Sequence, residues 1–155
     1  MRNHFYRLYQ FNHWANKKLA EALMEDYCEE GAKLLSHVVN AELIWYGRIN
    51  NESQHPIKLW QLHEPFLLKV YAIESSLNFF QLIDSCPEDD FYRMVCYMNT
   101  KGEAFETSLS DILLHVINHG SYHRGQVNKA LRSAGKNPVN VDFITFSRSE
   151  KKKFN

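Results

Sequence analysis

The stretch SLSDILLHVINHGSYHRGQVNKALRSAG (residues 108–135) combines the apolar spacing of a long helix with three histidines at four-residue intervals. Ser108 and Asp111 form a capping-box pattern, with Asp in place of the usual Glu, and Gly135 is a typical helix stop. The stretch therefore predicts a helix that begins after Thr107 or Ser108 and runs to Ser133. Its apolar face contains Leu109, Leu113, Val116, Gly120, Val127, Leu131 and Ala134.

Three more long helices are predicted upstream from the same spacing of apolar residues. They cover about Phe5 to Met24, Glu30 to Asn50 and Glu64 to Ile83. The third ends at Asp84-Ser85-Cys86-Pro87, because proline cannot continue a helix.

Residues 91–107 contain two short β-prone runs around Asn99-Thr100-Lys101-Gly102, the pattern of a hairpin turn. The predicted fold class is therefore all-α, an antiparallel four-helix bundle with a short β-hairpin before the last helix. No repeat or linker divides the chain, so we expect residues 1–155 to form a single domain. The tail from Pro138 to Phe146 is apolar enough to pack back on the bundle.

Composition excludes several classes of function. Lys+Arg and Asp+Glu both number 18, so the basic surface that nucleic-acid binding requires is not expected. No window approaches the roughly 18 uninterrupted apolar residues of a membrane span, and the charged N-terminus does not resemble a signal peptide. Cys28, Cys86 and Cys96 are too few and too irregularly spaced for a disulfide framework. These features predict a cytoplasmic protein.

The three histidines of the last helix differ in how far they face the core. At about 100° per residue, His123, His119 and His115 lie roughly 50°, 90° and 130° from the centre of the apolar sector. His115 and His123 are about 12 Å apart along the helix, too far for one metal to bind both. Adjacent histidines at i and i+4 can share a metal, and His119 with His123 is the more inward pair. We predict that this pair binds a metal ion.

The second helix offers a third ligand, His37, beside the apolar stripe of LLSHVVNAELIW. His4 and His13 belong to the first helix, and His63 to the connection before the third. A three-histidine site leaves coordination positions open to water or substrate, which is typical of catalytic metals. The alternative is that these histidines are ordinary packing or half-exposed residues.

Glu42 lies within the apolar sector of the second helix and has two interpretations. It could steady a ligand histidine or accept a proton as a catalytic group, or it could form a buried ion pair, for example with Arg124. The structural interpretation is favoured because buried carboxylates are usually structural partners. The three cysteines adjoin no histidine and no glycine-rich helix start, so we do not expect them to be nucleophiles.

Four segments, in order and spacing, resemble the DinB family of metalloenzymes. The segment HVINHGSYHRGQV followed by LRSAGKNPVNVDFITFSR is similar to the C-terminal signature of that family. FNHWANKKL resembles its first helix, LLSHVVNAELIWYGRI its second, and YMNTKGEAFETSLSDILLH the hairpin that leads into the last helix.

The resemblance implies a four-helix bundle of DinB/YfiT type, often a homodimer, with one divalent metal on three histidines. These correspond here to His37, His119 and His123, whereas His115 matches a position that is not usually a ligand and suits a supporting role. The metal implied is commonly nickel or zinc, although three-imidazole sites also accept Fe, Mn and Co.

The resemblance also implies candidate activities. Some relatives are thiol-dependent transferases that join bacillithiol, mycothiol or glutathione to electrophiles, and others resemble thiol-dependent isomerases. We therefore expect a metal-dependent S-transfer or related thiol reaction in detoxification or stress response, with a small-molecule thiol and an electrophile as substrates. The alternatives are a metal-dependent hydrolase, a non-enzymatic metal-binding stress-response protein, and a bundle that serves only for dimerisation.

Overall fold

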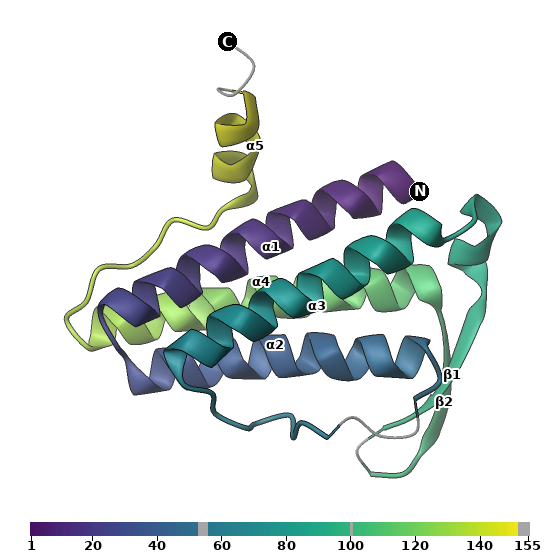
Figure 1. Cartoon of the computed structure of the whole chain (residues 1–155), viewed down its shortest axis with the longest axis horizontal. Coiled ribbons are helices and arrows are strands. Elements are labelled where there is room, and N and C mark those ends of the chain that lie inside the picture. The colour runs from purple at the N-terminus through teal and green to yellow at the C-terminus, as the bar shows by residue number, and fades with distance from the viewer. Residues whose placement is uncertain (53–55, 100, 152–155) are drawn as a thin grey trace.

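The computed structural model describes residues 1–52, 56–99 and 101–151, and within them four long helices form a bundle (Figure 1). The helices are α1 (Arg2–Glu25), α2 (Glu29–Ile49), α3 (Pro65–Ser85) and α4 (Leu109–Ser133). The most extensive contacts join α1 to α3 and α2 to α4, and both pairs run antiparallel (Figure 1). The predicted antiparallel four-helix bundle is confirmed.

The long connection between α2 and α3 returns the chain to the end of the bundle where α2 began, so α2 and α3 run in the same direction (Figure 1). Among the described residues, no helix is both apolar enough and long enough to cross a membrane.

The local signals at the ends of the helices are largely confirmed. Ser108 Oγ accepts a hydrogen bond from the backbone N–H of Asp111 at 3.1 Å, which fixes the start of α4. Gly135 follows the helix with φ +73°, a conformation that favours glycine. The first helix begins at Arg2, earlier than the expected Phe5, because the polar residues before Phe5 continue the same turn.

A two-stranded hairpin of β1 (Met94–Met98) and β2 (Ala104–Ser108) precedes α4, as predicted. Gly102 has the positive φ expected of its turn, whereas Thr100 lies outside the described residues. The expected β-prone run was placed too early, because Phe91 and Tyr92 belong to a short 3₁₀ helix, η1 (Glu88–Tyr92). Pro87 and three acidic residues at the start of η1 favour this helical turn.

The C-terminal tail packs back on the bundle, as expected, but it also forms a helix that the sequence did not predict. Residues 138–142, which we call the strap, run beside α4, and α5 (Phe143–Lys151) follows. Asn128 on α4 fixes the strap, because its side chain donates to Val139 O and accepts from Val139 N, both at 2.8 Å. Phe146 of α5 is buried against Phe11 and Trp14 of α1.

A polar network lies in the bundle interior around Glu42. One carboxylate oxygen accepts from Asn12 at 2.7 Å and Asn16 at 2.9 Å, and the other accepts from Ser75 at 2.6 Å. The same two asparagines accept from Arg124 Nη1 at 2.6 and 2.9 Å. The sequence-based pairing of Glu42 with Arg124 is therefore realised through two bridging asparagines, and we call these five residues the buried network.

Arg124 is a charged residue in the interior, and Gly120 makes room for it. A Cβ at Gly120 would lie 2.8 Å from Arg124 Nη1, so a larger residue would displace the guanidinium. Burial lowers the pKa of Arg124 to about 10, and Glu42 opposes that shift, so the guanidinium stays protonated at neutral pH. The positive charge is thus retained and held by the buried network.

Candidate metal centre

The structure brings His37 of α2 together with His119 and His123 of α4. Each of these residues offers a ring nitrogen, and the three nitrogens lie within 4.8 Å of one another. His37 Nε2 and His119 Nε2 are 3.1 Å apart. With metal–nitrogen bonds of about 2.0–2.1 Å, two nitrogens on one ion lie roughly 2.9–3.4 Å apart for right-angled to tetrahedral coordination. The His37–His119 pair therefore already has the spacing of two ligands on one divalent ion, and the His123 nitrogen lies within 4.8 Å of both.

Hydrogen bonds at Nδ1 orient two of the rings. His37 Nδ1 lies 3.3 Å from Leu59 O, and His123 Nδ1 lies 2.7 Å from Gln126 Oε1. Both partners are oxygen acceptors, so Nδ1 carries the proton in each neutral ring and Nε2 keeps its lone pair. Both histidines are thereby prepared to bind a metal through Nε2.

The protonation state of the cluster also suits metal binding. Burial lowers the pKa of His119 to about 4, assisted by His123, His37 and the other nearby cationic groups. Burial and His123 also lower the pKa of His37, while the bond to the Leu59 carbonyl acts in the opposite direction. Both rings are therefore neutral at pH 7, which is the state that binds a metal.

A loop between α2 and α3 covers one side of His37, and Asn40 holds that loop in place. Asn40 is fully buried and donates to Gln61 O at 2.8 Å and Lys58 O at 3.2 Å, while its oxygen lies 2.6 Å from His63 Nε2. The loop carries the Leu59 carbonyl that bonds His37. Asn40 thus connects the helix that bears His37 to the loop that orients its ring.

Trp60 in the same loop stacks on the His37 ring. The ring centroids are 3.7 Å apart with planes at 14°, and Trp60 is nevertheless 53% exposed. It therefore restricts the His37 ring while presenting an aromatic surface to solvent beside the three nitrogens.

His115 lies beside the cluster but is not one of the three residues that converge. Its ring centroid is 5.7 Å from that of His119 and 5.3 Å from that of Trp45. The guanidinium of Arg48 stacks on Trp45 at 4.5 Å. His115 therefore links the histidine cluster to an aromatic surface that extends toward the hairpin.

Asn40, Trp60 and Gln126 also belong to the site, although they were not predicted from the sequence. Asn40 had a usable signal, since it interrupts the apolar run HVVNAELI on the same helix as His37. Gln126 also had one, because it follows His123 by three residues on a helix. Trp60 had none, because its loop has no periodicity. His63, which was assigned only to the connection, is buried against Asn40.

Comparison with known proteins agrees with the four-segment resemblance. The family model described as DinB family matches residues 1–153. Protein DinB of Bacillus subtilis (strain 168) is 25% identical over an alignment 160 residues long, which covers 89% of this chain and 90% of that protein. The crystal structure of a DinB-like protein from Bacillus cereus ATCC 10987 is similar in fold, with a TM-score of 0.72 and 16% identity, covering 89% of this chain and 95% of that one. The match over nearly the whole length shows that the chain belongs to the DinB family.

Proposed function

We propose that this protein is a divalent-metal-dependent enzyme in which His37, His119 and His123 are the metal ligands. We further propose that it catalyses thiol-dependent S-transfer, or a related thiol reaction, in detoxification or stress response. The observation that supports the proposal is the convergence of three ring nitrogens within 4.8 Å of one another. Nickel and zinc are the favoured metals, and Fe, Mn and Co suit the same ligands.

The ligand set favours catalysis over a structural role for the metal. Among the described residues, the cluster contains three histidines and no carboxylate or cysteine to complete the coordination sphere. His119 and His123 are only partly buried, so the open side faces accessible space. Three protein ligands with an open position are typical of catalytic sites. When bound, a divalent metal acts as a Lewis acid that lowers the pKa of a coordinated thiol near neutral pH.

The surrounding residues suggest how the substrates are received. None of the cysteines belongs to the cluster, and Cys28 and Cys86 are buried, so we propose that the reacting thiol comes from a small molecule. Trp60 offers an exposed aromatic face next to His37, suited to an apolar electrophile.

We also propose that the protein is a homodimer that uses the outer face of α3. That helix carries exposed apolar side chains in addition to those that face the core, and a contiguous group of such side chains can serve as a protein interface. The exposed residues are Phe66, Leu67, Val70 and Leu77. Light scattering of the wild type and of Leu77→Asp tests this, with a dimer expected for the first and a monomer for the second.

The activity is tested with metal-loaded protein, glutathione or bacillithiol, and 1-chloro-2,4-dinitrobenzene. In the expected reaction a carbon–sulfur bond forms, the carbon–chlorine bond breaks, chloride leaves, and the thiol proton passes to solvent. His119→Ala should abolish the enzymatic rate, whereas the exposed Asn118→Ala should retain it.

The rivals predict different outcomes. Turnover of ester or amide substrates without any thiol would favour the hydrolase. Metal binding with no turnover across thiols and electrophiles would favour a non-enzymatic stress-response protein. Absence of metal binding would exclude the proposed function and both of these alternatives.

A further inference from the structure

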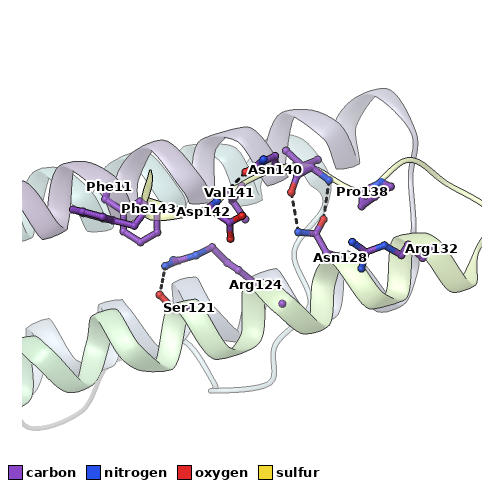
Figure 2. A pocket seen from close by; sticks show the side chains of 12 residues that line it. Phe11, Ser121, Arg124, Asn128, Arg132, Pro138, Asn140, Val141, Asp142 and Phe143 are labelled. Atoms are coloured by element: carbon purple, nitrogen blue, oxygen red, sulfur yellow. Dashed lines mark hydrogen bonds between the residues drawn. The ribbon is translucent and has the colours of Figure 1, made fainter. Parts of the chain in front are cut away.

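A pocket of about 520 Å³ lies between α4 and the strap, away from the histidine cluster (Figure 2). One face of α4 forms its base, the strap forms a wall, and Phe11 and Phe143 lie at one end (Figure 2). None of the three clustered histidines lines it. The pocket is therefore a separate candidate site, independent of the proposed metal-dependent function.

Arg124 provides a buried cation with hydrogen-bonding capacity to spare. It is 1% exposed, and three of its N–H groups donate to Asn12, Asn16 and Ser121. The N–H at Nε and the second one at Nη2 donate to no other described residue. A buried guanidinium with free donors that lines a cavity is suited to bind an acceptor from a ligand.

The other charged groups of the pocket are one arginine and one aspartate. Arg132 extends from α4 at the far end from Phe11 and makes no ion pair with a described residue (Figure 2). Asp142 lies on the strap and is the one carboxylate among the lining residues. The charge of Arg124 is offset by Glu42 through the asparagines, and Arg132 and Asp142 offset each other. The free N–H donors of Arg124, rather than the net charge of the pocket, therefore favour a ligand that is a strong hydrogen-bond acceptor.

Gly125 keeps the base of the pocket open. It lies inside α4, where glycine is less favourable than alanine, yet a Cβ there would meet nothing within 4 Å. No packing contact therefore requires the missing side chain. Its effect is to leave free space directly beside Arg124.

We propose that this pocket binds a small organic carboxylate. The free N–H groups of Arg124 donate to the carboxylate in charge-assisted hydrogen bonds, for which a guanidinium is well shaped. Arg132, at the opposite end of the pocket, adds only a longer-range attraction (Figure 2). Phe11 and Phe143, whose rings meet edge to face at 5.2 Å, contact the apolar body of the ligand. The hydrogen-bond donors at the base thus select a carboxylate, and the aromatic rings at the end select an apolar body.

The first experiment titrates the full-length protein with benzoate and, separately, with its neutral analogue benzamide, recording backbone amide NMR shifts. We expect benzoate to shift the amides of Val139 and Val141 with a Kd on the order of 1 mM, as for a fragment of this size. Benzamide should bind at least about tenfold more weakly, because it cannot form the charged contacts. Equal binding of the two, absence of binding, or shifts confined to another surface would overturn the proposal.

Variants locate the site and fix the sign of its charge preference. Gly125→Leu should abolish benzoate binding while metal uptake at the histidine cluster remains, which shows that the protein is folded. Arg132→Gln should weaken binding about two- to fivefold and Asp142→Asn should strengthen it by a similar factor, since the charge of each lies at the pocket edge. Asn is as good a helix cap as Asp, so Asp142→Asn keeps the start of α5.

Arg148→Gln, a change at an exposed arginine outside the lining residues, is the matched control and should leave the Kd unchanged. Wild-type affinity in Gly125→Leu, or equal effects of Arg132→Gln and Arg148→Gln, would show that benzoate binds elsewhere.

Discussion

Two polar clusters share the helices α2 and α4, and they differ in how completely their polar atoms are satisfied. The buried network also includes residues of α1 and α3. In the buried network, the Glu42 carboxylate accepts three hydrogen bonds and both bridging asparagines use donor and acceptor. In the histidine cluster, two Nε2 atoms lie 3.1 Å apart and the rings on α4 are partly exposed. A completed network contributes to the fold, whereas three imidazoles whose ring nitrogens lie within 4.8 Å of one another can bind a metal ion.

The two clusters also have residues close together on the same helices. Glu42 follows His37 on α2, and Arg124 follows His123 directly on α4. The buried network therefore sets the distance and rotation between the helices that carry the three histidines. Variants whose effects on stability and on metal affinity are measured separately test whether the buried network stabilises the fold and the histidine cluster binds the metal.

The largest effect on stability is expected for Glu42→Ala. It leaves Arg124 buried without its counter-charge, and it removes the acceptor of Asn12, Asn16 and Ser75. The free energy of unfolding should therefore fall by about 3–5 kcal/mol, measured by urea denaturation. Glu42→Gln keeps the shape and one acceptor oxygen and should lose less. A loss below about 1 kcal/mol for Glu42→Ala would mean that the network is not a main contributor to the fold.

Asn40→Ala should act mainly on the metal centre. Without its side chain the loop is no longer fixed to α2, so Leu59 O and Trp60 no longer orient His37. Metal affinity should fall about 10- to 100-fold, measured by competition with a chelator. Asn118→Ala, at an exposed position on α4, is the control and should bind as wild type. Unchanged affinity in Asn40→Ala would show that the loop does not orient His37.

The metal-free protein should lose stability as pH falls from about 6.5 toward 4. His119 in the folded protein has a pKa of about 4, whereas an unfolded histidine takes up a proton near its ordinary pKa, about 6.5. Over that range the unfolded chain binds more protons, so acid favours unfolding. Melting temperatures at neutral and acidic pH measure this effect, and His119→Gln should reduce it. An equal pH dependence in His119→Gln would assign the effect to other groups.

The smallest effect is expected for Gln126→Ala. Gln126 is only partly buried, so water replaces its oxygen as the acceptor for His123 Nδ1. Metal affinity should fall by about tenfold or less, the lower end of such effects, with little change in urea stability. A loss of stability as large as that of Glu42→Ala would contradict the distinction between the two clusters.

The sequence predicted the elements whose residues repeat with a regular spacing and missed those that depend on contacts across the fold. His119 and His123 were identifiable because four residues bring two side chains to one helix face. Glu42 was identifiable because it interrupts an apolar stripe. The bridging role of Asn12 and Asn16 was not, because it depends on how closely α1 approaches α2 and α4.

The loop that carries Trp60 was missed for a related reason. For the strap, the sequence predicted that the tail packs on the bundle but not which residue holds it. Neither has periodicity, and each is held by an asparagine on a helix, Asn40 for the loop and Asn128 for the strap. A buried asparagine in an apolar helix is a signal that a loop is held there, but the sequence does not say which one. The start of α5 after Asp142 was likewise invisible without the contact of Phe146 with α1.

The most direct test of the central claim is elemental analysis of the untagged protein beside His37→Ala, His119→Ala, His123→Ala and His115→Ala. If His37, His119 and His123 bind the ion, the wild type should contain near-stoichiometric divalent metal, the first three variants should lose it, and His115→Ala should retain it. A wild type that binds no metal even after incubation with nickel or zinc would contradict this assignment.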